Sequence, residues 1–419
     1  MKISLEKGHS SVQLSVPDVK IMGRLLGKDI PALGIESARK IISDGIRASA
    51  PDDPARKKVA IIIPDNTRLW ARGDLFVPVI VDTLIDLGVP SDAVTIIIAL
   101  GTHADLDETV FPRLAGEQCT GRIRILNSAN RNADRLVHLG RTRFGTDVRI
   151  TREACEADHI IIFGGVLHHL IAGFGGGRKY ILPGIAGYDA IQQNHSLAFL
   201  TDGRPHPMVA QARLAGNPVH EDMCEAADLF FKGKTSVYAA VASNGEGEIF
   251  YAGTGPVEET FQTACDRLDH ACTAPIEKKG DFALISAGGH RTDTQLYQAT
   301  KALFNAVNAV KEGGRLLFVA QAEEGVGNPE FESVLKQYAN RTETIGSRLL
   351  KRFSMPAYVA FRVLDLLNRF DITLVSDLSE QETTALGFGY VENPDDYVER
   401  LEGRGYIIPF AENILPVLK

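Results

Sequence analysis

Long apolar runs rich in β-branched residues recur along the first part of the chain. The segments between them have the apolar spacing of helices, as in 74–88, where Gly88 supplies a stop. Strands that are apolar on both faces and alternate with helices predict a parallel sheet covered on both sides. The runs that we assign to strands are VAIII at 59–63, VTIIIAL at 94–100, IRIL at 123–126 and HIIIFGG at 159–165.

A second set of such runs follows a polar, turn-prone segment at 275–280. It comprises the strands FALIS, RLLFVA and ITLVS, with a helix predicted over 294–314. The chain has 419 residues, which exceeds the size at which a single hydrophobic core stops growing. We therefore predict an α/β fold of two Rossmann-like domains with mostly parallel sheets, residues 1–274 and 275–419, and an active site in the interdomain cleft. The last segment of the chain can pack back on the N-terminal domain.

Charge, hydropathy and cysteine content limit which binding partners and which cellular compartment are expected. The formal net charge is -8 and there is no basic block, which argues against nucleic acid or an anionic membrane as a partner. No apolar run approaches the roughly 20 residues that span a bilayer, and the first residues lack the apolar core of a secretory signal. The five cysteines are scattered without a CxxC pair, which is typical of reduced thiols in a cytoplasmic protein.

Chemically capable side chains follow the ends of the predicted strands. Asp65 and Arg68 follow the first strand, His103 the second, and His168 and His169 the fourth. Parallel sheets bind ligands outside the carboxyl ends of their strands, so these side chains are expected to face a site. Taken alone, each has an ordinary structural reading as a cap or a turn residue. Successive side chains point in different directions, so only one of the two adjacent histidines is expected to face the site.

The segment AGFGGGRKYILPG at 172–184 combines three consecutive glycines with two cations. It does not fit a phosphate-binding P-loop, because Arg178 separates Gly177 from Lys179 and Tyr180 stands where the magnesium-binding hydroxyl belongs. The remaining explanation for the glycines is a close approach of the backbone to a bulky ligand. Lys179 is then an anion contact, an amine nucleophile or an attachment point.

The glycine segment and its flanks resemble a known family. The stretch HLIAGFGGGRKYILPGIAGYDAIQQNH, together with DNTR, GTH and YQATK, resembles the nickel-pincer-nucleotide-dependent lactate racemases, a family of 2-hydroxyacid racemases and epimerases. The resemblance implies that Lys179 is joined covalently to a pyridinium mononucleotide whose two sulfur-bearing arms hold nickel. It also implies that His195 completes the nickel coordination, which suits the imidazole ligand. His103 and His169 would be the two acid/base residues.

The remaining expectations rest on the same resemblance. Asp65, Gly176 and Gly177 are expected to bind the cofactor. The implied reaction is racemisation or epimerisation of a 2-hydroxy acid by reversible hydride transfer through a 2-keto acid, carried out by an isomerase that depends on cofactor-synthesis proteins. The residues expected to bind the substrate are Arg68, Tyr297, Gln298 and Lys301.

Departures from the family pattern leave the substrate open. Leu69 and Trp70 stand where proline is common after DNTR, and Ala104 stands where arginine is frequent after GTH. The substrate is therefore expected to be lactate-like, a hydroxy dicarboxylate or a sugar acid. Two other functions stay open: a lyase or aldolase that forms a Schiff base on Lys179, and a non-catalytic homologue that binds the cofactor or a small molecule.

Overall fold

The computed structural model describes residues 1–244, 247–338 and 342–419. The chain forms two compact units. The larger unit comprises residues 30–198 and 206–269, and the smaller unit comprises residues 1–29, 199–205 and 270–419. Each unit contains one six-stranded sheet that is wholly or mainly parallel, so the predicted α/β fold class is confirmed.

The sheet of the larger unit contains all four strands predicted in the first part of the chain. Five neighbouring strands, β12, β9, β4, β5 and β6, run parallel to one another. Strand β13 pairs antiparallel with β12 at the edge of the sheet. The three central strands are entirely or mostly buried, as expected for apolar runs covered on both faces. The order across the sheet is β13 (Ile249–Gly255), β12 (Thr235–Ser243), β9 (His159–Gly165), β4 (Val59–Pro64), β5 (Val94–Ala99) and β6 (Arg124–Asn127).

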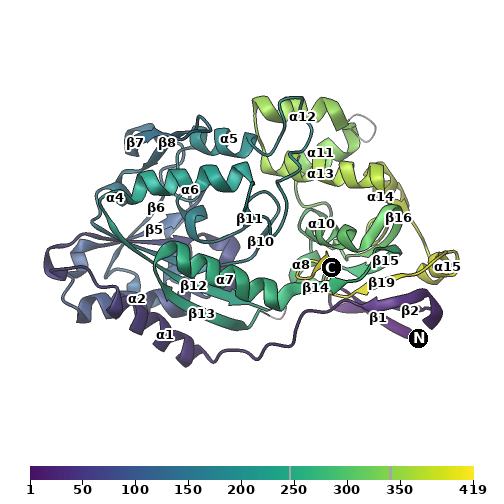
Figure 1. The fold of residues 1–419 in the computed structure, drawn as a ribbon, viewed down its shortest axis with the longest axis horizontal. Helices are drawn as coiled ribbons and strands as arrows, with labels where there is room; N and C mark the ends of the chain where they lie inside the picture. Colours follow the sequence, from purple (N-terminus) through teal and green to yellow (C-terminus); the bar gives the residue numbers. More distant parts are fainter. Residues whose placement is uncertain (245–246, 339–341) are drawn as a thin grey trace. The chain divides into compact units, whose positions relative to one another are not determined.

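Two helices cover one face of this sheet. Helix α1 (Ile35–Ala48) buries Ala38, Ile42 and Ile46, which recur every four residues on one side of the helix. Helix α2 (Gly73–Asp86) packs beside it, and the two helices run next to each other in Figure 1. Their apolar side chains join alternate strand residues in one continuous core.

The strand order of the larger unit reverses between β4 and β9. From β4 the chain adds β5 and then β6 on one side, and it later adds β9 and β12 on the other side. Such a reversal leaves a crevice at the carboxyl ends of the two central strands, where open α/β sheets bind their ligands.

Smaller elements of the larger unit carry the loops that follow these strands. Strand β7 (Leu136–Arg141) pairs with β8 (Asp147–Thr151), and β10 (His168–His169) pairs with β11 (Gly173–Phe174), both antiparallel. The helices that matter below are α5 (Tyr188–Ser196), α6 (Pro218–Phe231) and α7 (Val257–Cys272).

The smaller unit has an all-parallel sheet of its own. The predicted strands FALIS, RLLFVA and ITLVS lie within β15, β16 and β17 and are confirmed. The sheet reverses between β15 and β19. Its order is β18 (Gly389–Tyr390), β17 (Asp371–Val375), β16 (Val310–Val319), β15 (Gly280–Ser286), β19 (Gly405–Ile408) and β3 (Ile21–Arg24).

Two features of the smaller unit differ from the sequence prediction. The prediction placed residues 1–29 with the N-terminal domain, but β3 pairs with β19, so these residues belong to the smaller unit. Because the paired segments are almost 400 residues apart, no local sequence pattern indicates that they pair. The predicted helix over 294–314 ends early, with α9 (Leu296–Ala299) and α10 (Lys301–Ala306), because Val310 already pairs with Gly280 in the sheet.

The end of the chain also lies in the smaller unit, where β20 (Leu415–Leu418) pairs in parallel with β14 (Thr273–Ile276). Across the described residues no helix is both long and apolar enough to cross a membrane. The five cysteines are all free thiols.

Candidate active site

The predicted site residues of the larger unit follow β4 and β9, which flank the reversal of its sheet, and β5, which lies beside β4. Asp65 and Arg68 follow β4, and His103 follows β5. His169 and the glycine loop with Lys179 follow β9. The carboxyl edge of this sheet therefore carries these side chains at the place where an α/β sheet offers a crevice.

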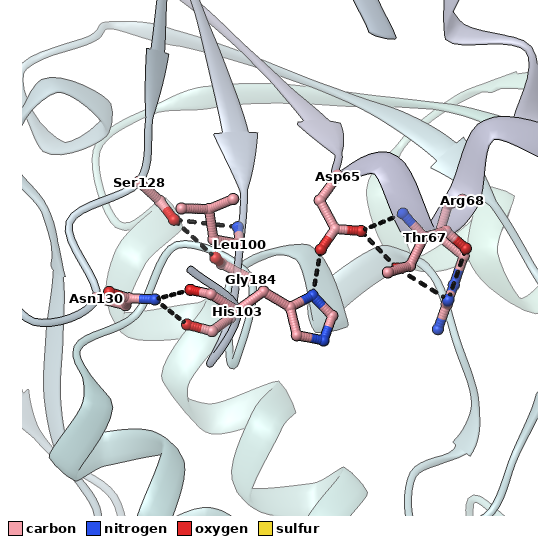
Figure 2. Close-up of polar contacts among 9 residues, drawn as sticks. Asp65, Thr67, Arg68, Leu100, His103, Ser128, Asn130 and Gly184 are labelled. Atoms are coloured by element: carbon pink, nitrogen blue, oxygen red, sulfur yellow. Dashed lines mark hydrogen bonds and ion pairs between the residues drawn. The ribbon is translucent and has the colours of Figure 1, made fainter. Parts of the chain in front are cut away.

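Asp65 caps the short 3-10 helix at Asn66–Ala71 and also contacts His103. One carboxylate oxygen accepts the backbone N–H of Thr67 at 3.0 Å and the Thr67 hydroxyl at 2.5 Å. The other oxygen pairs with His103 Nδ1, as Figure 2 shows. Burial alone would raise the pKa of Asp65. The hydrogen bond that its carboxylate accepts from His103, the charge of His103 and the hydrogen bonds from Thr67 together hold that pKa below its usual value. Asp65 is expected to be an anion at neutral pH.

Two residues that the sequence prediction missed fix the backbone around His103. Asn130 Nδ2 donates to the carbonyl oxygens of Gly101 and His103, both at 2.8 Å (Figure 2). Ser128 Oγ accepts the N–H of Leu100 at 3.1 Å and donates to a carbonyl of the glycine loop. Both residues follow β6 in the stretch ILNSAN, at the same edge of the sheet. This position after a strand is the sequence feature from which their place near the site could have been predicted.

The pairing with Asp65 assigns the protons of the His103 ring. A carboxylate only accepts, so Nδ1 donates and Nε2 keeps its lone pair in the neutral ring. The His103 side chain is 54% exposed, so Nε2 can meet a substrate or solvent. A histidine oriented through Nδ1 by a buried carboxylate is the arrangement of a general base.

The two adjacent histidines have separate surroundings. They occupy successive positions of β10, so their side chains point to opposite sides of that strand. His168 Nε2 pairs with Asp269 at 2.7 Å, and its ring lies against Phe174. His168 is therefore engaged with Asp269, and the prediction of an acid/base role concerns His169.

His169 lies among positive groups. Burial lowers its pKa well below the usual value, and the charges of Lys179, Arg68 and Arg178, with an interaction with His195, lower it further. These interactions place His169 close to the predicted cofactor lysine, substrate arginine and nickel ligand. The acid/base role of His169 itself stays a prediction.

Backbone contacts assign the protons of the His169 ring. Its Nδ1 accepts the backbone N–H groups of Ile171 at 3.3 Å and Ala172 at 3.2 Å. The neutral ring therefore carries its proton on Nε2, the opposite tautomer to His103.

The glycines of the loop are explained by the packing of the protein itself. Gly176 and Gly177 have φ values of 98° and 53°, which favour glycine. A Cβ at Gly176 would lie 2.7 Å from the Tyr238 hydroxyl, and one at Gly177 would lie 2.9 Å from the Phe261 ring. The predicted contact of these glycines with a cofactor stays a prediction, since close packing already requires them.

Arg178 is buried beneath the glycine loop and stabilises it through hydrogen bonds. It is 5% exposed and donates to the carbonyl oxygens of Ala172 at 2.7 Å and Gly176 at 3.2 Å. Its Nε donates to His220 Nδ1 at 2.9 Å, and its guanidinium lies over the Phe261 ring. Burial lowers the pKa of Arg178 to about 10, so it remains a cation at neutral pH. No role for Arg178 can be predicted from the sequence, because a buried arginine has the same local pattern as an exposed one.

Lys179 follows on the same 3-10 turn, at Gly177–Tyr180. Burial lowers the pKa of its amine to about 7, and the neighbouring charges of Arg68 and Arg178 contribute, while Asp65 acts in the opposite direction. About half of the Lys179 amines are therefore neutral at pH 7. A neutral amine is the nucleophilic form of lysine.

His195 lies near the end of α5 and is 4% exposed. Burial lowers its pKa to about 3, and the charge of Lys179 adds to this effect. Its Nδ1 lies 3.0 Å from Asn194 Oδ1. Neutral imidazole is the form that binds metals. Among the described residues, no three His, Cys, Asp or Glu side chains gather as a metal site.

The predicted substrate residues Tyr297, Gln298 and Lys301 lie in the smaller unit, on α9 and at the start of α10. Burial, with the charge of Glu330, raises the pKa of Tyr297 to about 12, so its hydroxyl stays protonated. Lys301 Nζ lies 3.9 Å from a carboxylate oxygen of Glu412, which follows β19. These residues lie after the two strands at which the sheet of the smaller unit reverses. Their substrate role stays a prediction.

Comparison with known curated proteins identifies relatives of this chain. It is 29% identical over 298 residues to the lactate racemase of Lactiplantibacillus plantarum, covering 71% of this chain and 68% of that protein. It is 26% identical over 356 residues to the lactate racemase of Thermoanaerobacterium thermosaccharolyticum, covering 84% and 81%.

Comparison with solved structures supports the same fold. The lactate racemase apoprotein of Thermoanaerobacterium thermosaccharolyticum superimposes with a TM-score of 0.84 at 22% identity, over 100% of both chains. A protein from Thermotoga maritima superimposes with a TM-score of 0.67 at 18% identity, over 94% of this chain and 100% of that one.

Two family models match most of the chain. The model of the lactate racemase N-terminal domain matches residues 7–206, and that of the lactate racemase C-terminal domain matches residues 276–401. These matches agree with the relatives found by sequence and with the fold. The chain therefore belongs to the lactate racemase family and is an isomerase.

Proposed function

We propose that this chain racemises or epimerises a 2-hydroxy carboxylic acid, using a nickel-pincer nucleotide attached to Lys179. Lactate is the first substrate to consider, because the relatives are named as lactate racemases. The observation that carries the proposal is the composition of one sheet edge. It combines the Asp65–His103 pair and His169 with the Arg68 guanidinium and the partly neutral amine of Lys179.

The residues at this edge fit the proposed cofactor. Lys179 offers a partly neutral amine for covalent attachment, and buried His195 offers a neutral imidazole for nickel. Arg68 and Arg178 supply positive charge, which suits an anionic nucleotide and a carboxylate substrate. When bound, such a group supplies reversible removal of the Cα hydrogen as a hydride.

The proton of the substrate hydroxyl goes to His103. Its Nε2 has the lone pair, and Asp65 stabilises the imidazolium that forms. The hydroxyl carbon becomes the planar carbonyl of a 2-keto acid as its Cα hydrogen leaves with the bonding electrons. Because the His103 ring is half exposed, it can release its proton to solvent after the turnover.

His169 returns a proton to the oxygen when the hydride reaches the other face of the carbonyl. Two histidines are needed because the two enantiomers present their hydroxyls on opposite sides. Burial is the largest cause of the low pKa of His169, and a bound substrate carboxylate raises that pKa by offsetting the positive charges that add to it. Protonated Nδ1 cannot accept the N–H groups of Ile171 and Ala172. We therefore expect the ring to turn away from them during the reaction.

Arg68 is the proposed clamp for the substrate carboxylate. Its Nη1 donates to the carbonyl and the hydroxyl of Thr67 at 3.0 and 3.1 Å, which ties the guanidinium to the residue that also holds Asp65 (Figure 2). A guanidinium can bind a carboxylate through two parallel hydrogen bonds and so retain the 2-keto acid while its carbonyl turns over. Gln298 and Lys301 are proposed as further substrate contacts.

Intact mass and nickel content test the proposal. Protein produced together with the cofactor-synthesis proteins should carry a nucleotide-sized adduct on Lys179 and one nickel per chain. The Lys179→Arg variant should lose the adduct, and His195→Ala should lose nickel with its fold intact. His138→Ala is the matched control, since His138 is half exposed and pairs with Asp147 in the β7–β8 hairpin.

Two outcomes would contradict the proposal. Wild-type protein from such cells that carries neither adduct nor nickel would remove the cofactor assignment. If borohydride then trapped a keto acid on Lys179, the Schiff-base lyase would replace the racemase. Protein that carries nickel but no adduct would support the cofactor assignment and contradict only its covalent attachment to Lys179.

A further inference from the structure

A chain of buried polar side chains lies behind His195. Asn194, its neighbour on α5, is fully buried, and so is Asp222 on α6. Asn194 Nδ2 donates to the Val219 carbonyl at 3.0 Å and to Asp222 Oδ2 at 2.8 Å. Burying a carboxylate and an amide costs free energy unless both are hydrogen-bonded. This pair satisfies its needs within the protein.

Asp222 is fixed in turn by two hydroxyls of the segment that joins β7 to β8. Thr142 Oγ1 donates to Asp222 Oδ1, and Thr146 Oγ1 donates to Asp222 Oδ2 at 2.8 Å. Thr142 Oγ1 itself accepts the backbone N–H of Thr146 at 3.2 Å, so its own proton is directed to the carboxylate. Asp222 therefore has a defined position relative to Asn194.

The chemistry of these partners determines which way the Asn194 amide points. The Val219 carbonyl oxygen accepts hydrogen bonds and cannot donate them, so the amide nitrogen must face it. The amide oxygen then faces His195 Nδ1, at 3.0 Å. This oxygen also only accepts, so Nδ1 must carry the proton. In the neutral ring the lone pair is then on Nε2.

We infer that Asn194 and Asp222 position His195 and select its Nδ1–H tautomer, so that Nε2 is the nitrogen presented to a metal. The inference rests on the proposed function only in taking nickel as that metal. Groups that orient a ligating histidine through its other nitrogen typically contribute 10- to 100-fold to metal affinity. Asn194 and Asp222 are positioning residues, since they act through His195.

The tautomer can be measured in the full chain without cofactor. Histidine labelled with ¹⁵N gives long-range proton–nitrogen NMR correlations that distinguish Nδ1–H from Nε2–H, and the His195→Gln variant assigns the signals. Wild-type protein is expected to show His195 as Nδ1–H. Wild-type His195 in the Nε2–H form would overturn the inference without any variant having to fold.

Two variants separate positioning from a merely structural role. Asn194→Leu removes the acceptor at similar size, so His195 should shift towards Nε2–H, and nickel retention in protein made with the cofactor-synthesis proteins should fall about 10- to 100-fold. Asp222→Asn removes the charge but keeps an amide oxygen that can accept from Asn194 Nδ2, and it leaves the Val219 carbonyl in place, so His195 should keep the Nδ1–H form. If Asn194→Leu is less stable but keeps the wild-type tautomer, the network is only structural and the inference fails.

Failure of this inference and failure of the proposed function give different results. If His195 is Nδ1–H and depends on Asn194, yet His195→Ala retains nickel, the positioning network stands and the nickel assignment falls. If His195→Ala loses nickel but the wild-type ring is Nε2–H, the nickel assignment stands and the inference falls.

Discussion

The amine of Lys179 should titrate far below an ordinary lysine. With a pKa of about 7 against a usual value of 10.5, about half of the amines are neutral at pH 7, compared with about 1 in 3,000 for an unperturbed lysine. The gain in free amine is therefore about 1,500-fold. A less basic nucleophile reacts more slowly, and a Brønsted slope of about 0.5, as for thiols, reduces the gain to about 30-fold.

Competitive acetylation of the full chain without cofactor measures this titration. The protein is labelled with trace acetic anhydride at a series of pH values, and the modified peptides are quantified by mass spectrometry. Lys40, whose side chain is 76% exposed, provides the reference for reagent reactivity. The labelling of Lys179 should reach half of its maximum near pH 7, and this midpoint does not depend on how accessible the amine is.

The neighbouring cations should account for part of the shift. Arg68→Gln should move the midpoint upwards but leave it below 10.5, because burial is the largest cause of the lowered pKa. Arg56→Gln is the matched control, since Arg56 is 86% exposed and pairs with Asp53. A wild-type midpoint above pH 9 would refute the reasoning, and so would a midpoint that Arg68→Gln leaves unchanged.

The same titration affects stability with a definite sign. Between pH 7 and 10.5 the unfolded chain holds a proton on Lys179 that the folded chain has largely lost. The free energy of unfolding therefore rises with pH across this range through this group. Lys179→Met should remove that part of the slope in urea unfolding measured at several pH values.

Three further predictions concern the reaction itself. Asp65→Asn removes the charge that stabilises the His103 imidazolium, so kcat should fall about 10²- to 10⁴-fold with little change in KM, and an unchanged kcat would argue against the pair. His169→Ala should abolish inversion while His168→Gln, its matched control beside it in the chain, should retain it; equal loss in both would remove the distinction between the two histidines. Arg68→Lys keeps the charge but loses the two-pronged grip on a carboxylate, so KM should rise about 10-fold or more, and an unchanged KM would exclude Arg68 as the clamp.

The strands and the site-bearing edge of the larger unit could be predicted from the sequence. Strand β4 is continuous in its apolar character, so its limits and its burial follow from the run at 59–63. Side chains at the ends of parallel strands share one edge of the sheet, which is why Asp65 and His103 could be grouped before their contact was seen. The acid/base role of His169 rests on the family resemblance and stays a prediction; the structure shows only that charged groups surround this residue.

Other features depend on contacts between distant segments and have no local pattern. The sequence predicts a cofactor contact for Asp65, and nothing in it indicates the contact of Asp65 with His103. Asn194 and Asp222 lie 28 residues apart and meet only because α5 and α6 pack together. The glycine loop also indicates a close approach of the backbone to a bulky ligand. The space beside Gly177 is filled by Phe261, a residue more than 80 positions away.

The fate of the Cα hydrogen tests the proposed reaction most directly. Holoprotein made with the cofactor-synthesis proteins is incubated with one enantiomer of 2-deuterated lactate, and in parallel with a 2-deuterated hydroxy dicarboxylate. The inverted product is then isolated on a chiral column and analysed by mass spectrometry. Hydride removal and return predicts an inverted product that retains deuterium at Cα. An inverted product that carries hydrogen from water at Cα would show exchange through a carbanion and contradict the proposed mechanism.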